Sequence, residues 1–209
     1  TNWQNPLYDA QWYGSKLLKQ IFGNRFSYPK SLYAVKECIS FFLEDKPNAL
    51  IVDFFAGSGT TLHATNLLNA EDGGHRRCIC VTNNEVSADE ETEFIQNGLR
   101  PYDEKWQKYG IANYVTWPRT VCSIEGHDIN GKPLEGDYGK PNENIDLGYS
   151  LPKADGFKGN AIFCELTYES AWPIRLDNAF DAIAPILWMQ AGCLGDIIRK
   201  VGKSYLTTD

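Results

Sequence analysis

The sequence predicts an α/β domain with a mostly parallel sheet flanked by helices. Residues 49–55 form an apolar run with one charge, Asp53, near its end, which is typical of a buried strand in a parallel sheet. A glycine-rich stretch at residues 56–61, here called the glycine loop, follows this run, and a second apolar run occupies residues 77–81. A strand, a glycine loop, a helix and a second strand in about 30 residues predict a βαβ unit with a right-handed crossover.

Two helices are predicted before this unit. A short helical stretch lies within residues 1–22, where leucine and isoleucine recur with a spacing of three or four. The second helix follows Pro29 and Ser31, which are typical of a helix start, and its apolar residues continue to Leu43 with the same spacing.

After the βαβ unit the pattern becomes mixed. An acidic helix is predicted to start at residues 88–93, and residues 111–117 are predicted to form a strand that ends at a proline. Residues 160–168 predict another strand and residues 179–191 another helix. Both apolar runs of the βαβ unit are expected to be buried strands.

The chain is predicted to have three parts. Residues 1–122 form a partial α/β domain, and residues 123–159 are a Gly- and Pro-rich excursion or linker. Residues 160–209 form a C-terminal α+β extension.

Composition narrows the classes of function. With 43% apolar and 22% charged residues, the sequence is typical of a soluble globular protein. No apolar run approaches the roughly 20 residues of a membrane helix, and no signal peptide precedes the domain, so we expect a cytoplasmic protein without a membrane partner. The net charge of −7 argues against a chain that binds DNA by itself, because such proteins usually carry a basic face.

Cysteines and histidines do not indicate a metal site. The six cysteines form no CxxC pair, and His63, His75 and His127 lack the spacing of metal ligands. Cys78 and Cys80 are expected to be buried thiols on one face of the second strand.

The glycine loop is the most informative motif, and its sequence is compared with three types of ligand-binding loop. A P-loop requires a lysine after its last glycine, but Thr60 and Thr61 follow Gly59. A dinucleotide fingerprint requires a third glycine where Leu62 stands. The third type, an acid followed by x-Phe-x-Gly-x-Gly, is matched in full from Asp53 to Gly59. This pattern suits a cationic ligand, because the carboxylate is available to an ammonium group or organises the loop beside it.

The motif Phe-Ser-Tyr-Pro-Lys-Ser at residues 26–31, followed by a helix and then Asp-Phe-Phe-Ala-Gly-Ser-Gly-Thr-Thr at residues 53–61, resembles the amino-methyltransferases of DNA. The resemblance is greatest to adenine-specific enzymes of restriction-modification systems, including the modification subunits of type III systems. In these families both motifs bind S-adenosylmethionine (AdoMet), and their order here is that of the β class. The resemblance implies a Rossmann-like methyltransferase fold, which this chain contains only incompletely.

Carried over residue by residue, the resemblance implies specific roles. Asp53 binds the ammonium group of the methionine part. Ser58, Thr60 and Thr61 form hydrogen bonds to its carboxylate, which the helix N-terminus also stabilises. Lys30 and Ser31 close over the methionine end. The ribose is usually held by an acid after the second strand, but Thr82 and Asn83 stand there. The cofactor residues implied are Tyr28, Pro29, Lys30, Ser31, Asp53, Phe54, Phe55, Ala56, Gly57, Ser58, Gly59, Thr60, Thr61, Thr82 and Asn83.

The sequence departs from the family where catalysis is concerned. These enzymes carry a motif of the form Asp/Asn/Ser-Pro-Pro-aromatic that bonds the amine of a flipped-out base. The nearest strings, at residues 5–8 and 117–119, lack the second proline, so no catalytic residue is predicted. In the β-class order this motif precedes the cofactor motifs, and Thr1 is no natural start residue. We therefore expect a C-terminal portion of a longer enzyme.

These observations predict the AdoMet-binding part of a DNA adenine-N6 methyltransferase, inactive alone, that meets DNA through the full-length enzyme. A homodimer or a restriction subunit is the expected protein partner. The alternative is a non-catalytic AdoMet-binding subunit or sensor that needs a partner chain for methyl transfer. A methyltransferase for another substrate and a dinucleotide-binding protein are two further alternatives.

Overall fold

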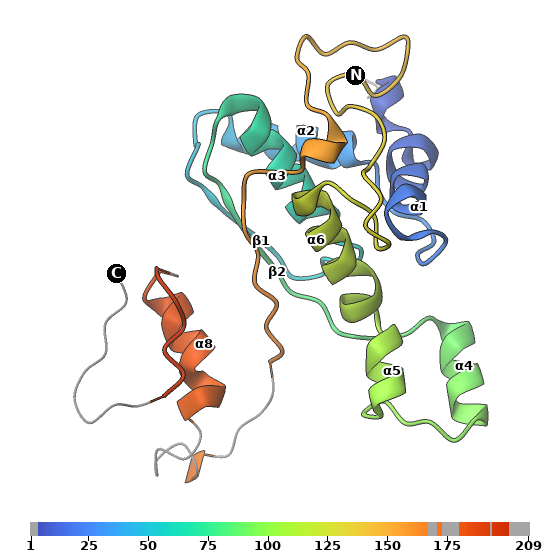
Figure 1. Cartoon of the computed structure of the whole chain (residues 1–209), viewed down its shortest axis with the longest axis vertical. Coiled ribbons are helices and arrows are strands. Elements are labelled where there is room, and N and C mark those ends of the chain that lie inside the picture. The colour runs from blue at the N-terminus through green and yellow to red at the C-terminus, as the bar shows by residue number, and fades with distance from the viewer. Residues whose placement is uncertain (1–3, 167–170, 173–179, 193, 201–209) are drawn as a thin grey trace. The chain divides into compact units, whose positions relative to one another are not determined.

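A computed structural model describes residues 4–166, 171–172, 180–192 and 194–200 of the chain. The chain divides into two compact units, Thr1–Ala161 and Ile162–Asp209. The first unit contains the glycine loop. Figure 1 gives the element labels used below.

The first unit begins with short helices that lead to the predicted helix. They are η1 (Pro6–Tyr8), η2 (Gln11–Ser15) and α1 (Lys16–Phe22). Helix α2 (Leu32–Leu43) starts at Ser31, whose side chain accepts a hydrogen bond from the backbone N–H of Ala34 at 3.4 Å. The capping function predicted for Ser31 is therefore confirmed.

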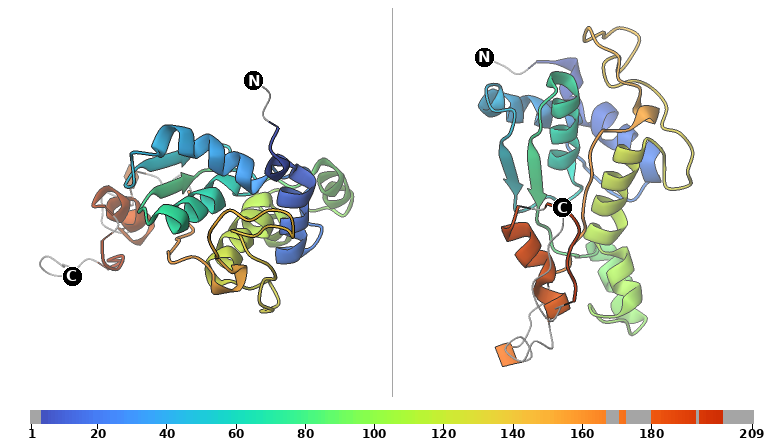
Figure 2. Two further views of the ribbon diagram at one scale, coloured as in Figure 1. Left: turned by 90° about the horizontal axis from the view of Figure 1, so that it is seen from above. Right: turned by 60° about the vertical axis from the view of Figure 1, so that its left-hand side comes forward.

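The βαβ unit is present as predicted. Strand β1 (Leu50–Asp53) and strand β2 (Arg77–Cys80) are parallel, and helix α3 (Thr60–Asp72) connects them. In register, Leu50 lies opposite Arg77 and Asp53 opposite Cys80. Helix α3 lies along the strands, with the later helix α6 (Trp117–Glu125) on its other side (Figures 1 and 2). The α/β class is confirmed, and the larger Rossmann-like sheet stays a prediction.

The two strands are less buried than predicted. Side chains alternate along each strand, so Ile51, Cys78 and Cys80 are half-buried on one face. On the other face Val52 is 46% exposed and Ile79 45% exposed. An all-apolar run is typical of a strand covered on both faces, but α3 covers only one face here. The prediction of two fully buried strands was therefore wrong.

The predicted strand at residues 111–117 is helical. After α4 (Ala88–Gln96) and α5 (Glu104–Tyr109), a π-helical stretch η3 (Ala112–Thr116) runs directly into α6. The β-branched residues suggested a strand, but tertiary packing overrides such propensities. The buried residues recur every three or four positions, which is the period of a helix. Those with this spacing are Ala112, Val115, Arg119 and Cys122, and Thr120 and Ser123 beside them are also buried.

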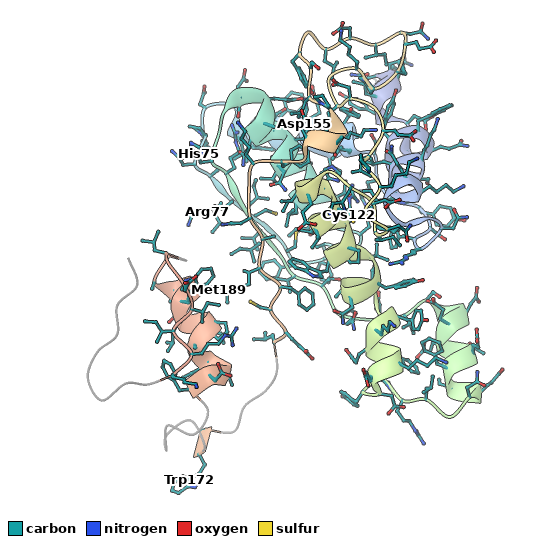
Figure 3. All side chains as sticks on the ribbon, in the orientation of Figure 1. His75, Arg77, Cys122, Asp155, Trp172 and Met189 are labelled. Atoms are coloured by element: carbon teal, nitrogen blue, oxygen red, sulfur yellow. The ribbon has the colours of Figure 1, made fainter. Side chains whose placement is uncertain are left out.

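Helix α4 begins at Ser87, whose hydroxyl and Glu90 form a reciprocal capping box, as expected for an acidic helix start. Pro118 was predicted to end a strand, but it lies in the first turn of α6, where a proline is tolerated. Figure 3 shows Cys122 of α6 among packed side chains, and it is 3% exposed.

The segment 127–159 has little regular structure, yet it contributes to the core. Leu134, Tyr138 and Phe157 are buried together with residues of α1, α2, α3 and α6. Its only helix among the described residues is η4 (Lys153–Asp155). The Tyr149 hydroxyl contacts Glu71 of α3. Glu71 also forms a salt bridge with Lys36 of α2, with 2.7 Å between Nζ and the carboxylate oxygen. The segment is thus held against the helices by both apolar and polar contacts.

The second unit contains helix α8 (Phe180–Gln190), in agreement with the helix predicted at residues 179–191. The strand predicted at residues 160–168 is not formed at residues 160–166, and residues 167–168 lie outside the described residues. Residues 160–166 are exposed and belong to no described sheet, and a strand without a partner would leave its backbone groups unpaired.

The cysteines differ in burial. Cys122 is buried and Cys78 and Cys80 are half-buried free thiols, whereas Cys38 and Cys164 are exposed. The two strand cysteines share a face with their sulfur atoms 3.7 Å apart, so the predicted common face is confirmed and full burial is not.

Candidate functional site

Asp53 lies at the end of β1 and organises the glycine loop. One oxygen of its carboxylate accepts the backbone N–H of Phe55 at 3.1 Å, and the other accepts the hydroxyl of Thr61 at 2.6 Å. The carboxylate therefore connects the strand end to the first turn of α3. Each oxygen retains a further lone pair, so these bonds leave Asp53 able to accept an additional donor.

The backbone of the glycine loop is fixed by its neighbours on both sides. Ala56 donates its N–H to the carbonyl of Val81 at 3.1 Å, which joins the loop to the end of β2. Gly57 and Gly59 have φ angles of +50° and +73°, in the left-handed region that favours glycine. A Cβ atom on Gly59 would lie 3.1 Å from the Cγ2 of Thr116, whose hydroxyl donates to the carbonyl of Gly57.

The outer side of the loop is open and aromatic. Phe54 is 67% exposed and Phe55 is 94% exposed, although both are large apolar side chains. Their rings offer apolar surface beside the carboxylate of Asp53. Such a combination suits a ligand that has both an aromatic ring and a charged group.

Helix α3 begins at the loop without a side-chain cap. Its N-cap residue is Gly59, which makes no side-chain hydrogen bond to the first turn. The positive end of the helix dipole therefore faces the loop, and this geometry favours an anion.

A buried arginine lies behind the loop, and the sequence prediction missed it. The guanidinium of Arg119 donates from Nη1 to the carbonyl of Ser58 at 3.1 Å, to its hydroxyl at 3.2 Å, and to the hydroxyl of Thr60 at 2.8 Å. Arg119 has no exposed surface. The available signal was that Arg119 is the single charged residue in residues 111–124, a stretch that is otherwise neutral.

The same guanidinium fixes the state of a buried histidine. Arg119 donates from Nε to Nδ1 of His63 at 3.2 Å, so this nitrogen is the unprotonated acceptor. The other ring nitrogen therefore carries the hydrogen and donates it to the hydroxyl of Tyr138 at 2.8 Å. Burial, and secondarily the charges of Arg119 and Lys153, lower the pKa of His63 well below its ordinary value of 6.5.

The charge of Arg119 persists despite its burial. Desolvation lowers the pKa of Arg119 to about 10, and a guanidinium with this pKa is protonated at neutral pH. We call the set of Arg119, Ser58, Thr60, His63 and Tyr138 the Arg119 network.

The Pro-Lys element lies before α2. Tyr28 is 95% exposed and has a φ of +59°, whereas Pro29 is buried and Lys30 is exposed. Ser31 is 2% exposed, and its hydroxyl donates to the carbonyl of Leu7 at 2.6 Å. The hydrogen bonds of Ser31 thus join this element to the N-terminal segment and to α2.

Thr82 and Asn83 follow β2 at the same edge of the sheet as the glycine loop. Thr82 is half-buried and Asn83 is exposed, with its amide donating to the carboxylate of Glu85 at 2.8 Å. The next residue, Asn84, has a structural function, because its side chain accepts the backbone N–H groups of Ala112 and Asn113.

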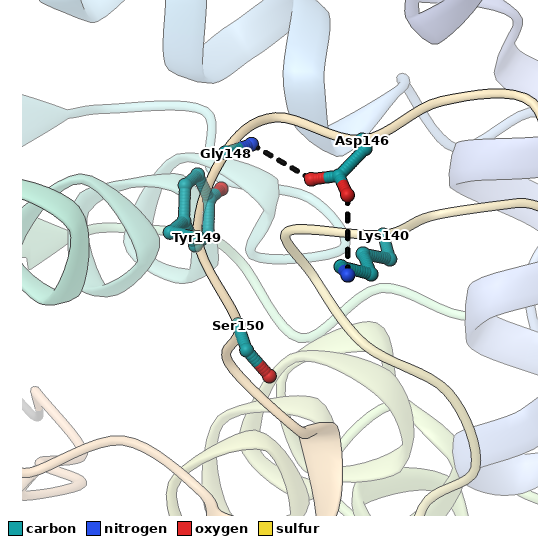
Figure 4. A pocket seen from close by; sticks show the side chains of 5 residues that line it. All are labelled: Lys140, Asp146, Gly148, Tyr149 and Ser150. Carbon is teal, nitrogen blue, oxygen red and sulfur yellow. Dashed lines mark hydrogen bonds and ion pairs between the residues drawn. The ribbon is translucent and has the colours of Figure 1, made fainter.

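A separate hollow of about 270 Å³ lies in the segment 127–159 (Figure 4). Its charged residues already satisfy each other, since Lys140 and Asp146 form an ion pair at 3.1 Å and Asp146 accepts the N–H of Gly148. The other lining residues are Tyr149 and Ser150. Nothing in this lining matches the chemistry of the glycine loop.

The described residues contain no group of three or more His, Cys, Asp or Glu side chains suited to a metal ion. Nor is any described helix both long and apolar enough to cross a membrane. The two strings nearest to a catalytic motif are parts of helices: Asn5 caps η1, and residues 117–119 begin α6.

The first half of the chain is similar to known proteins. Residues 2–98 match the family described as DNA methylase. Type II methyltransferase M.KpnI from Klebsiella pneumoniae is 47% identical over 68 residues, which are 32% of this chain and 16% of the relative.

Two modification subunits of type III enzymes also match. The StyLTI Mod subunit from Salmonella typhimurium is 40% identical over 81 residues, which are 38% of this chain and 12% of the relative. The EcoPI Mod subunit from Escherichia phage P1 is 33% identical over 84 residues, or 40% and 13% of the two proteins. The matched region is thus a small part of each relative. The predicted resemblance to DNA methyltransferases and type III modification subunits is confirmed.

Proposed function

Because residues 2–98 match the DNA methylases, we propose that this chain is the AdoMet-binding part of a DNA adenine-N6 methyltransferase of a restriction-modification system. The observation that carries the proposal is the glycine loop. A carboxylate at the strand end, Asp53, and the uncapped start of α3 lie at its two ends. AdoMet is cationic at its sulfonium and ammonium and anionic at its carboxylate, which complements these two features.

We assign the parts of AdoMet to the loop and its surroundings. The ammonium is placed at Asp53, the carboxylate at the start of α3, and the adenine beside the exposed rings of Phe54 and Phe55. The remaining assigned residues are Tyr28, Pro29, Lys30, Ser31, Ala56, Gly57, Ser58, Gly59, Thr60, Thr61, Thr82 and Asn83. When bound, AdoMet supplies the methyl group, and the residues of this chain hold and orient it.

We propose that methyl transfer requires a further polypeptide segment. The strings closest to a catalytic motif serve helix starts, and Arg119 of the second string is buried. The target DNA and a restriction subunit are the proposed partners, since two relatives are named as Mod subunits of type III restriction-modification enzymes.

The test is calorimetric titration of the chain with AdoMet, with Asp53→Asn measured beside it. The asparagine retains the shape and the acceptor for Phe55 but removes the charge. We expect the wild type to bind and the variant to lose about 1.5–3 kcal/mol, the range for a hydrogen bond to a charged group. An excess of NAD is expected to displace no AdoMet, which separates this site from a dinucleotide site.

A matched control replaces a carboxylate far from the loop. Glu135 is exposed and pairs only with Lys132 at 2.6 Å among the described residues, so Glu135→Gln is expected to bind AdoMet like the wild type. Absence of AdoMet binding by the wild-type chain, or equal affinities of wild type and Asp53→Asn, would contradict the proposal.

A further inference from the structure

The Arg119 network contains a buried positive charge that has no carboxylate partner in the described part of the chain. Arg119 has no exposed surface, and its four hydrogen bonds run to neutral groups of Ser58, Thr60 and His63. Among the described residues its Nη2 has no hydrogen-bond partner, and no carboxylate forms an ion pair with it. An uncompensated buried charge is strongly unfavourable, so the arrangement lacks an anion.

The other buried arginine of this unit has a carboxylate partner, although its Nε also lacks a hydrogen-bond partner among the described residues. Arg76 is 4% exposed and forms a 2.8 Å salt bridge with Asp72. It also donates to the carbonyl of Leu43 at 2.9 Å. The two arginines therefore share burial but differ in charge compensation, and only Arg119 lies against the glycine loop.

The hydrogen bonds of Arg119 orient two hydroxyl groups. Ser58 and Thr60 both accept from Nη1, so the hydrogen of each hydroxyl is directed elsewhere. Their oxygens are 3.2 Å apart, and one hydroxyl donates to the other. One hydroxyl therefore retains a hydrogen for another acceptor. Both residues are only 5% exposed, and they lie at the start of a helix whose N-terminus attracts anions.

We propose that Arg119 is a positioning residue for the carboxylate of bound AdoMet and supplies its counter-charge through the hydroxyls of Ser58 and Thr60. This inference rests on the proposed function and adds to it a residue about 60 positions away in sequence from the loop. The guanidinium of Arg119 lies behind the loop, and the hydroxyls of Ser58 and Thr60 lie between it and the proposed position of the carboxylate at the N-terminus of α3. The positive charge is then balanced only when the ligand is present.

The experiment compares two ligands that differ in the carboxylate alone. The chain is titrated with AdoMet and with decarboxylated AdoMet, for wild type, Arg119→Gln and Arg119→Lys. We expect Arg119→Gln to weaken the binding of AdoMet about tenfold or more, a change equivalent to about 1.4 kcal/mol. The affinity for decarboxylated AdoMet is expected to change by less than about threefold. Arg119→Lys keeps the charge and is expected to retain the preference for the carboxylate.

The control is Arg76→Gln, which removes the other buried guanidinium and is expected to leave the ratio of the two affinities unchanged. Circular dichroism shows which variants are folded. If Arg119→Gln is unfolded, Arg119→Met takes its place, because it removes the charge and fills the buried volume with an apolar chain while Ser58 and Thr60 remain. The same loss of carboxylate preference is expected.

Each outcome is decisive. Equal losses for both ligands, or no loss for either, would show that Arg119 only supports the loop, and the positioning role would be overturned while the proposed function stands. A wild-type chain that binds both ligands equally also overturns it. A wild-type chain that binds neither overturns the proposed function together with this inference.

Discussion

At the scale of single residues, the glycine loop depends on contacts with side chains behind it. Gly59 has a left-handed φ of +73°, and its Cα faces Thr116 so closely that an added Cβ would lie 3.1 Å from the Cγ2 of Thr116. Gly73, at the other end of α3, has the same φ of +73° but open space around it. The two glycines thus separate backbone strain from crowding.

We predict that Gly59→Ala destabilises the chain more than Gly73→Ala. Both pay the cost of a left-handed alanine, roughly 1–2 kcal/mol, whereas only Gly59→Ala also displaces Thr116. Urea unfolding of the two variants measures the difference. Only Gly59→Ala is expected to weaken AdoMet binding as well. Equal free energies of unfolding of the two variants would contradict the contact with Thr116.

His63 predicts a pH dependence of stability. Its pKa in the folded chain lies well below the ordinary value of 6.5, because burial and the charge of Arg119 disfavour the protonated ring. Below pH 6.5 the unfolded chain therefore binds a proton that the folded chain does not. The contribution of His63 to the free energy of unfolding therefore falls as the pH falls, by up to about 1.4 kcal/mol per pH unit.

The measurement compares wild type with His63→Gln, whose side chain does not titrate. Urea midpoints at pH 7.5 and pH 5.5 are expected to show a relative loss of stability of the wild type of about 1.4 kcal/mol. Parallel pH profiles of the two proteins would mean that His63 binds its proton equally well in the folded and unfolded chains, which contradicts a lowered pKa.

At the scale of elements, the main difference from expectation concerns the two strands. Apart from Asp53 and Arg77 their residues are apolar, yet Leu50, Val52 and Ile79 are between 45% and 51% exposed. Apolar residues on both faces are typical of a strand that is covered on both faces. Here α3 covers one face only, so the apolar residues of the other face are exposed.

We predict that polar substitutions on the open face cost little. Val52→Thr and Ile79→Thr are each expected to change the free energy of unfolding by less than about 0.5 kcal/mol, as for exposed positions. Leu67→Ala on α3 is the contrast, since Leu67 has no exposed surface and its truncation is expected to cost about 2–5 kcal/mol. A cost at Val52 similar to that at Leu67 would reveal that this face is covered in solution.

At the scale of the whole molecule, the chain consists of two units joined by an exposed connection. Phe157 is buried in the core of the first unit, whereas residues 158–166 are all exposed. An exposed backbone is accessible to proteases, and a buried one is not.

We predict that limited trypsin digestion cleaves after Lys158 before it cleaves after Lys153 or Arg119. Lys153 is half-buried and Arg119 is fully buried. Mass spectrometry identifies the fragments, and the N-terminal product is expected to retain the thermal transition of the full chain. Early cleavage at Lys153 would show that the segment 127–159 opens more readily than its core contacts imply.

The sequence by itself determined the features that depend on neighbours along the chain. The βαβ unit, the cap at Ser31 and the helix at residues 180–190 follow from the spacing of apolar residues and from local start signals. The glycine loop and its acid, Asp53, were visible because the motif is contiguous. Its resemblance to DNA methylases was confirmed over residues 2–98.

Only the tertiary structure decided what lies behind the loop and what covers it. Arg119 reaches Thr60 across 59 positions and His63 reaches Tyr138 across 75, and no local period encodes such contacts. The helix at residues 112–125 replaces a predicted strand because burial against α1 and α3 outweighs the preference of its β-branched residues. Local patterns specify elements, whereas long-range packing specifies which charged groups meet. Here it places a guanidinium beside the glycine loop with no carboxylate partner among the described residues.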